Sequence, residues 1–187
     1  MKQKSLIDSL SSLLEVMKKE IDRPGGKKWC PMATVSPEGF PQNRYIILRS
    51  MDLSKGHFIF YTHAQSRKVA DLETSARAVL CWYLQSKRLQ LQFFCTPKRI
   101  TQTKELRTYW KTLYELSHKD YQGPPPGSPA SEALSNPDSS TKDSERHFAA
   151  FRLYWERIEA LELRKEENQR RVYVRHQSDW DSFVCHP

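Results

Sequence analysis

Two short hydrophobic runs joined by a turn constrain the fold of this 187-residue chain more than any other feature. The first run, 45–48, and the second, 57–62, consist mainly of aromatic, β-branched and aliphatic residues, which favour β-strands. The segment 51–56 ends in a glycine and supplies the turn between them. We therefore expect two adjacent antiparallel strands, followed by a short helix that begins at Ser66, with this serine as its cap.

Cationic side chains flank this strand pair. Arg44 begins the first strand and Arg49 ends it, whereas Arg67 and Lys68 lie at the start of the expected helix. Fixed positive charge beside the free N–H groups of a helix N-terminus makes a binding site for a phosphate. Taken singly, each residue is better explained as a solvated side chain at the end of an element, so only the group indicates a site.

The remaining segments predict a mainly β protein with peripheral helices. Leucines and other apolar residues recur at helical spacing over 5–21, which predicts an amphipathic helix with one face on the body. Its polar face mixes both charges, which favours core packing over a membrane surface. About seven antiparallel strands and three helices indicate a small barrel or sandwich. Besides the pair above, the segments with strand character are 32–35, 77–84, 89–100, 149–155, 158–163 and 171–175, and 180–184 closes the chain.

A third helix and a long loop complete the expected organisation. Aromatic and leucine side chains form a stripe along 104–117, which predicts a helix that packs on the core or on a second subunit. The segment 121–143 is rich in proline, glycine and serine and has no periodicity, so we expect a long flexible loop. We expect residues 1–187 to form one domain.

Composition narrows the partners without choosing among them. The formal net charge is +8, which suits an anionic partner such as nucleic acid, an acidic surface or a phosphorylated small molecule. The longest apolar run, 78–84, is far too short to span a bilayer. The N-terminal segment is amphipathic rather than continuously apolar, so no signal peptide is predicted and a cytoplasmic location is expected. The four cysteines and six histidines are scattered, which favours reduced thiols and gives a metal site no support.

Four pieces of the sequence, in order and at matching separations, resemble one known family. These pieces are the run from Arg44 to Arg49, Tyr61-Thr62, Ser66-Arg67-Lys68, and Gln90. They are similar to the FMN-binding signature of pyridoxamine 5'-phosphate oxidase and its split-barrel relatives. Trp82-Tyr83, the segment 116–127 and a C-terminal pattern from Leu161 to Pro187 resemble one branch of this family, flavoproteins from cyanobacteria and plants. The resemblance runs from about residue 29 to the end of the chain, and it implies a split β-barrel homodimer with FMN at the subunit interface.

The resemblance also implies roles for individual residues. Arg44, Arg67 and Lys68 match positions that hold the FMN phosphate, and Ser66 belongs to the same element. Three cations suit a phosphomonoester, which is close to a dianion. The positions that match contacts to the flavin ring, or lie among them, are Tyr45, Ile46, Ile47, Tyr61, Thr62 and Gln90. Arg171 matches an arginine that approaches FMN, although a gap of one residue would exchange it with Arg170.

Departures from the family pattern concern the substrate. Arg49 stands where the oxidase has a lysine that helps to hold the vitamin phosphate, so the charge stays but the hydrogen-bond geometry changes. Leu161 replaces a tryptophan near the flavin, and 168–173 replaces the Arg-Leu-His substrate element. These changes argue against pyridoxamine phosphate as the substrate. Trp82 and Trp110 are expected to help bury a dimer surface.

Three functions remain open at this point. The first is an FMN-dependent oxidoreductase of unknown substrate, in which the cofactor does the chemistry. The second is a flavin- or haem-binding carrier or sensor without turnover, because a fold does not fix a function. The third is a basic β-barrel that binds nucleic acid, which is less favoured because the aromatic residues lie mostly in apolar runs.

Overall fold

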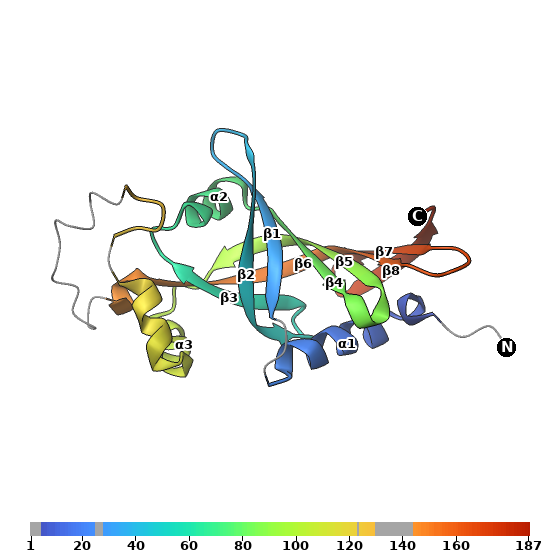
Figure 1. Ribbon diagram of the computed structural model, residues 1–187, viewed down its shortest axis with the longest axis horizontal. Coiled ribbons are helices and arrows are strands. Elements are labelled where there is room, and N and C mark those ends of the chain that lie inside the picture. The colour runs from blue at the N-terminus through green and yellow to red at the C-terminus, as the bar shows by residue number, and fades with distance from the viewer. Residues whose placement is uncertain (1–4, 25–27, 123, 130–143) are drawn as a thin grey trace.

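The computed structural model describes residues 5–24, 28–122, 124–129 and 144–187, and it is dominated by long antiparallel strands (Figure 1). Short helices lie at the ends and along one side of these strands. The helices are η1 (Leu6–Asp8), α1 (Leu10–Asp22), α2 (Arg67–Ser75), η2 (Gln85–Lys87), α3 (Thr103–Thr112), η3 (Glu115–Tyr121) and η5 (Glu145–His147). The strands are β1 (Trp29–Val35), β2 (Pro41–Asp52), β3 (His57–His63), β4 (Ala78–Leu84), β5 (Leu89–Arg99), β6 (Phe148–Glu162), β7 (Gln169–His176) and β8 (Asp179–Cys185).

Six of these strands close into a barrel. In the described residues the sheet order is β3-β2-β1-β4-β5-β6-β7-β8, and β3 also pairs with β6, which joins the two ends of the six-stranded part. Every recorded pairing is antiparallel. The prediction of a mainly β, antiparallel split barrel with peripheral helices is therefore confirmed. The β7–β8 hairpin continues the sheet beyond the closed part (Figure 1).

The barrel interior is filled by alternate residues of each strand. Along β4 and β5 buried residues alternate with partly or fully exposed ones over most of each strand, as a strand with one face in a core requires. Phe58 packs edge-on against Phe93, with ring centroids 4.9 Å apart, and contacts Trp155 at 5.0 Å. Trp82 also points into this core and is only 5% exposed. The expectation that Trp82 covers a dimer surface is therefore wrong, because an even-numbered residue of β4 faces inward.

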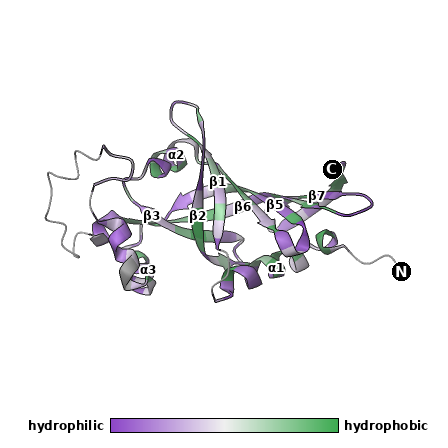
Figure 2. Ribbon diagram, viewed as in Figure 1, coloured by the Kyte–Doolittle hydropathy of each residue, from purple (hydrophilic) through white to green (hydrophobic). Residues whose placement is uncertain are grey.

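The N-terminal helix is amphipathic, as its spacing predicts. Its N-cap is Ser9, whose hydroxyl accepts a hydrogen bond from the Ser12 N–H at 3.4 Å. Four apolar side chains on one face are buried in the core: Leu13, Leu14, Met17 and Ile21. Figure 2 shows polar and apolar residues interleaved along α1, which lies across the lower end of the barrel. In the described residues no helix is long and apolar enough to cross a membrane.

Two predicted boundaries differ from the structure. The expected strands 149–155 and 158–163 are one strand, β6, in which the register against β5 passes from Cys95–Trp155 to Phe94–Arg157. Glu156 is thus the extra residue of a β-bulge, which bends a strand without ending it. The helix expected over 104–117 ends at Thr112, and Leu113 is its extended C-cap. Most of the expected loop 121–143, namely 123 and 130–143, lies outside the described residues.

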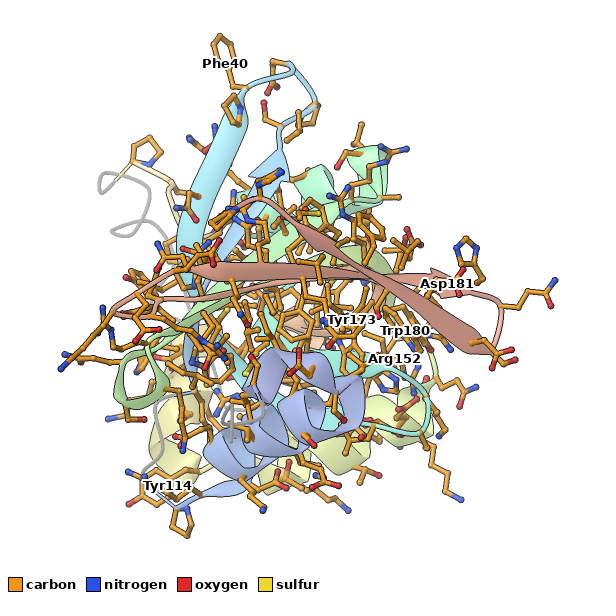
Figure 3. All side chains as sticks on the ribbon, turned by 90° about the vertical axis from the view of Figure 1, so that its right-hand side faces the viewer. Phe40, Tyr114, Arg152, Tyr173, Trp180 and Asp181 are labelled. Carbon is orange, nitrogen blue, oxygen red and sulfur yellow. The ribbon has the colours of Figure 1, made fainter. Side chains whose placement is uncertain are left out.

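Glycine is required at the turn between β2 and β3. Gly56 has a φ of 68°, which disfavours residues with a side chain. A Cβ atom there would also lie 2.8 Å from Nη1 of Arg175. The turn is therefore fixed both by its backbone conformation and by its packing against the β7–β8 hairpin. This hairpin, with Trp180 and Asp181 labelled, faces the viewer in Figure 3.

Candidate functional site

Arg44 lies at one end of the barrel and is held by two neighbours. Its guanidinium donates from Nη1 to the Thr34 hydroxyl on β1 and from Nη2 to Oδ2 of Asp71 on α2, the latter at 2.8 Å. The Thr34 hydroxyl donates in turn to the same Asp71 oxygen at 2.6 Å. Because Thr34 and Asp71 are 4% and 2% exposed, this network fixes the guanidinium at the edge of the core.

Lys68 reaches the same end of the barrel from α2. Its Nζ donates to the Thr62 hydroxyl at 3.1 Å and to the Ser66 hydroxyl at 2.5 Å. Burial lowers the pKa of Lys68 from its ordinary value, the charge of Arg44 lowers that pKa further, and Asp71 partly offsets both. The two cations are therefore close enough to repel each other, and a bound anion would relieve that repulsion.

The helix that carries Lys68, α2, has the predicted N-cap residue, but the side chain of that residue does not cap it. Ser66 is the N-cap of α2, yet its side chain makes no capping hydrogen bond to a backbone N–H. The hydroxyl accepts from Lys68 instead. The Val69 N–H bonds to the Ser66 carbonyl at 2.8 Å, whereas the first N–H groups of a helix have no intrahelical partner. The N–H groups of Arg67 and Lys68 have no recorded acceptor among the described residues.

Arg67 lies at the mouth of this site rather than inside it. Its side chain is exposed, and its Nε lies 3.8 Å from the point where a Cβ on Gly127 would be. The fully exposed Glu38 lies nearby. A hydrogen bond from Ser36, first, and then the Glu38 backbone and the charge of Arg67 hold the pKa of Glu38 below its ordinary value. The structure thus brings Arg44 and Lys68 together and leaves Arg67 at the edge, where only solvent and loop atoms confine it.

The balance of charge at this site favours an anion. Arg44 is paired with one buried carboxylate, that of Asp71, whereas Lys68 donates only to hydroxyls among the described residues. These three charged groups together carry +1, and Arg67 at the mouth lies near the carboxylate of Glu38. A helix N-terminus adds a partial positive charge at the same place. The arrangement matches a phosphate monoester, which carries roughly −1.5 to −2 at neutral pH.

A second group of the predicted residues lies on the outer face of the sheet. Tyr45 is 68% exposed, and Ile47 is partly exposed on the same face of β2. Gln90 is half-buried on β5 opposite Tyr83, which is 50% exposed. Ile46, by contrast, is 5% exposed and belongs to the core, so only its backbone is available to a ligand. Trp29, opposite Ile47 and 59% exposed, extends this face.

Arg49 and Tyr61 form a third group beside α3. The guanidinium carbon of Arg49 lies 5.4 Å from the centre of the Tyr61 ring, within the range of a cation–π contact. The Nε of Arg49 is buried and has no partner among the described residues. Burial raises the pKa of Tyr121 to about 12, against the nearby charge of Arg49. Arg49 therefore has a free donor in a largely aromatic surrounding.

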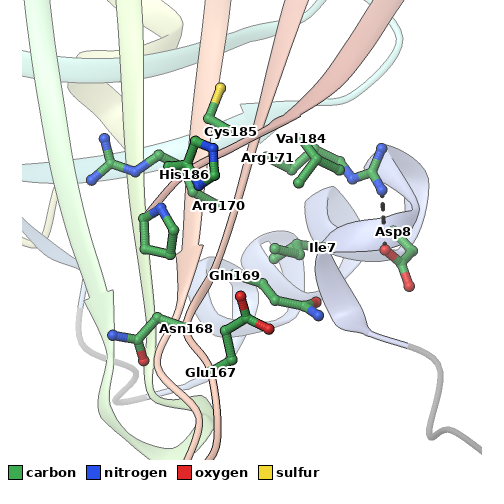
Figure 4. Close-up of a pocket in the computed structure, with 11 residues that line it drawn as sticks. Ile7, Asp8, Glu167, Asn168, Gln169, Arg170, Arg171, Val184, Cys185 and His186 are labelled. Carbon is green, nitrogen blue, oxygen red and sulfur yellow. Dashed lines mark hydrogen bonds and ion pairs between the residues drawn. The ribbon is translucent and has the colours of Figure 1, made fainter.

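Arg171 lies far from Arg44 within this chain. It extends from β7 into a cavity of about 520 Å³ between η1 and the β7–β8 hairpin (Figure 4). There its Nη2 donates to Oδ1 of Asp8 at 3.2 Å, the dashed line in Figure 4. The neighbouring Arg170 reaches Glu159 at 3.6 Å. The structure does not bring either arginine to the α2 end of the barrel within one chain.

Sequence reasoning missed three residues of this site. Thr34 and Asp71 orient Arg44, and His63 stacks on His147 with ring centroids 4.9 Å apart. Burial lowers the pKa of His63, and the charges of His147 and Lys68 add to this effect. Asp71 did give a signal, because it is a carboxylate on the buried face of α2, together with Val69 and Leu72. An acid at such a position indicates a buried cation.

The fold and the site define a split-barrel protein with a group of cationic side chains at one end of the barrel. The family model of pyridoxamine 5'-phosphate oxidase matches residues 17–139. This chain therefore belongs to the pyridoxamine 5'-phosphate oxidase family.

Its curated relatives match over only part of the chain. The pyridoxine/pyridoxamine 5'-phosphate oxidase of Azorhizobium caulinodans is 32% identical over 98 residues, which cover 52% of this chain and 45% of that protein. The oxidase of Rhodospirillum rubrum is 38% identical over 64 residues, 33% of this chain and 32% of that protein. The matched part thus spans less than half the length of these relatives.

Solved structures match over the whole fold. A pyridoxamine 5'-phosphate oxidase-related, FMN-binding protein from Nostoc punctiforme superposes with a TM-score of 0.77 at 22% identity, over 100% of both chains. PhzG from Burkholderia lata, solved with tetrahydrophenazine-1-carboxylic acid, gives 0.76 at 18% identity, over 99% of this chain and 98% of its own. At such identities the likeness shows the fold alone.

Proposed function

We propose that this chain binds FMN and holds its phosphate between Arg44, Lys68 and the first N–H groups of α2, with Arg67 closing the mouth. The observation that carries the proposal is the placement of two partly buried cations, of which Arg44 is paired with a carboxylate, beside a helix N-terminus. Thr62 and Ser66 hold the Lys68 ammonium where it can meet a phosphate oxygen. Hydrogen bonds between charged partners are roughly twice as strong as neutral ones.

The flavin ring belongs, in this proposal, on the outer face of the sheet at a homodimer interface. Tyr45, Ile47 and Gln90 lie on that face, and Tyr61 and Thr62 lie on β3 at the same end of the barrel. Trp29, Tyr45 and Tyr83 expose 59%, 68% and 50% of their surface. Large aromatic side chains exposed together on one face of a sheet are typical of an interaction surface. Aromatic residues are enriched in the cores of protein interfaces. A second copy would cover both these rings and the flavin.

The activity that fits such a site is an FMN-dependent oxidoreductase. The flavin, when bound, supplies the acceptor of a hydride or of electrons at its N5 atom. The residues of this chain bind the phosphate, orient the ring and exclude water. Arg49 would hold an anionic group of the substrate, because its buried Nε has no partner among the described residues. The substrate itself is not assigned.

We further propose that the chain forms one domain and works in the cytoplasm. The six-stranded barrel and α1 share one hydrophobic cluster. All four cysteines are free, and Cys30 and Cys95 are buried in that cluster, which suits a reducing compartment.

FMN binding is tested by the spectrum of the protein as purified and by fluorescence titration of the apoprotein with FMN. The wild type should show flavin absorbance or take up one FMN per chain. The variant Arg67→Ala/Lys68→Ala should weaken FMN binding by at least tenfold, since charged hydrogen bonds contribute about 1.5–3 kcal/mol each. The control Lys18→Ala/Lys19→Ala, on α1, should bind as the wild type. A colourless protein that takes up no FMN contradicts the proposal.

The oxidoreductase assignment needs its own test. FMN-loaded protein is mixed anaerobically with NADH, NADPH or pyridoxine 5'-phosphate, and bleaching of the flavin absorbance is followed. Reduction by one donor, and reoxidation when oxygen is admitted, support an enzyme. A loaded protein whose flavin no donor reduces is a carrier or sensor, and the enzymatic part of the proposal then fails while FMN binding stands.

A further inference from the structure

A second cavity opens on the outer face of the barrel, away from the α2 end. Its volume is about 410 Å³. The floor consists of β2, β3 and β6, and α3, the end of α1 and the β2–β3 turn form its walls. His57 lies at the first position of β3, whereas Thr62 of the site above lies five residues further along. At roughly 3.3 Å per residue, the two places are roughly 17 Å apart along the strand.

The carboxylates at this cavity are already occupied. Glu105 on α3 accepts from the Tyr109 hydroxyl at 2.7 Å and from Nη2 of Arg152. Burial raises the pKa of Glu105, but these bonds outweigh it and hold that pKa below the ordinary value. Asp52 accepts from the Ser54 hydroxyl at 2.7 Å and from the Lys55 N–H at 3.0 Å. Neither acid is left to receive a cation.

The donors, in contrast, are largely unused. A guanidinium has five N–H donors, and Arg152 gives only its Nη2 group to a partner among the described residues. The Lys55 ammonium is 71% exposed and lies 3.8 Å from Asp52, too far for a hydrogen bond. Figure 3 marks Arg152 on the outside of the barrel core, near the β2–β3 turn.

His57 gives an independent sign of a ligand. The ring lines the cavity and is only 3% exposed, yet its Nδ1 is buried with no partner among the described residues. A buried polar atom without a partner costs about 1–3 kcal/mol, so the ring would gain stability if it turned this nitrogen toward a ligand bound in the cavity. Ile59 and Leu53 add an apolar surface beside these donors.

We propose that this cavity binds a small organic anion, a phosphate ester or carboxylate with an apolar body, through Arg152, Lys55 and His57. The spent carboxylates and the unused donors select an anion over a cation. The volume holds a molecule of several heavy atoms beyond the anionic group, and Ile59 and Leu53 would contact its apolar part. This site is separate from the proposed FMN site, and its occupation does not depend on FMN.

The test uses phenyl phosphate as the probe and the full chain with Arg67→Ala/Lys68→Ala, which removes the cations of the other site. Nitrogen-15 NMR follows the Arg152 Nε–H and the His57 ring during titration. We expect saturable shifts of both signals, with phenyl phosphate bound at least tenfold more tightly than inorganic phosphate. Arg152→Met should weaken phenyl phosphate at least tenfold, and the matched Arg99→Met, which removes an exposed ion pair with Glu73, should not.

Two results overturn the proposal. One is the absence of shifts at Arg152 and His57 at millimolar phenyl phosphate. The other is equal shifts with sodium chloride or benzyl alcohol, which would mean screening or apolar contact without an anion site. Because the NMR readout uses chains with Arg152 intact, it decides the question even if Arg152→Met fails to fold. Loss of FMN binding elsewhere in the protein leaves both readouts unchanged, so the two proposals fail separately.

Discussion

Two regions of this barrel gather arginine and lysine side chains, and they differ in how the charges are balanced. At the α2 end, Arg44 pairs with Asp71 at 2.8 Å, and Lys68 donates only to hydroxyls among the described residues. On β7, Arg171 bonds to Asp8 at 3.2 Å, and Arg170 lies 3.6 Å from Glu159, which also pairs with Arg157. Each β7 arginine thus has a carboxylate within reach, whereas the two cations at α2 have one between them.

The difference teaches where an anion gains most. A phosphate at α2 relieves the repulsion between two cations that burial brings together, and it meets a helix N-terminus as well. A phosphate at β7 must first compete with Asp8 and Glu159. Two adjacent arginines that each have a carboxylate partner are therefore weaker evidence of a ligand than two cations that are far apart in the sequence, meet in the fold and have one carboxylate beside them.

Removing both cations at α2 should have the largest effect. Arg44→Met/Lys68→Met should weaken FMN binding by 100-fold or more, because two charge-assisted hydrogen bonds, at about 1.5–3 kcal/mol each, are lost. Fluorescence titration measures this. Lys18→Ala/Lys19→Ala serves as control for the loss of two positive charges from the protein. An affinity within threefold of the wild type would contradict the α2 site.

Replacing Asp71 by an uncharged residue tests how the cations at the α2 end are balanced. Asp71→Asn should lower the free energy of unfolding of the apoprotein by roughly 2 kcal/mol, because Arg44 loses its buried partner. That corresponds to a melting temperature about 4–8 °C lower for a chain of this size. Saturating FMN should raise the free energy of unfolding of this variant by more than it raises that of the wild type. Glu73→Gln, at the exposed pair with Arg99, should change stability by less than about 0.5 kcal/mol.

The β7 side should respond less. Arg171→Met should weaken FMN binding tenfold or less, since its guanidinium is engaged by Asp8, and any contact with FMN would have to come across a dimer interface. The companion Asp8→Asn frees that guanidinium and should leave FMN affinity unchanged or slightly higher. If Arg171→Met abolished FMN binding as completely as the α2 double variant, the proposal that FMN binding depends mainly on the α2 end would be contradicted.

The smallest effect is a dependence on pH. Because the pKa of Lys68 lies below its ordinary value of 10.5 in the free protein and a bound phosphate raises it, FMN binding is strongest while Lys68 is protonated. Affinity should therefore fall as pH rises through that lowered pKa, earlier than an exposed lysine would cause. Titrations over the alkaline range measure this. Lys68→Met should bind weakly and lack this step, and a step that persists in it would assign the change to another group.

Much of the fold could be predicted from local sequence patterns. The strands around 45–48 and 57–62 and the helix start at Ser66 follow from residue type and turn chemistry, and the structure has all three, although the Ser66 side chain makes no capping bond. The break expected between 155 and 158 is a bulge inside β6. Glu156 and Arg157 look like an interruption in the sequence because a bulge places two polar residues together, and only the pairing with β5 shows that the strand continues.

The site was less predictable, because its decisive feature is a long-range contact. The cations Arg44 and Lys68 could be found from their motif, but the Arg44 partners, Asp71 and the Thr34 hydroxyl, come from separate elements. Which face a residue occupies also depends on register, so Trp82 lies inside the barrel while Tyr83 is exposed on the outer face. The cavity at His57 combines four separate segments of the chain, and no local pattern marks it.

A crystal structure of the protein grown with FMN tests the central claim most directly. The account predicts a phosphate whose oxygens lie within hydrogen-bond distance of the Arg44 guanidinium, Lys68 Nζ and the N–H groups at the start of α2. An FMN phosphate bound instead by Arg170 and Arg171, with the α2 end holding only water, would contradict it.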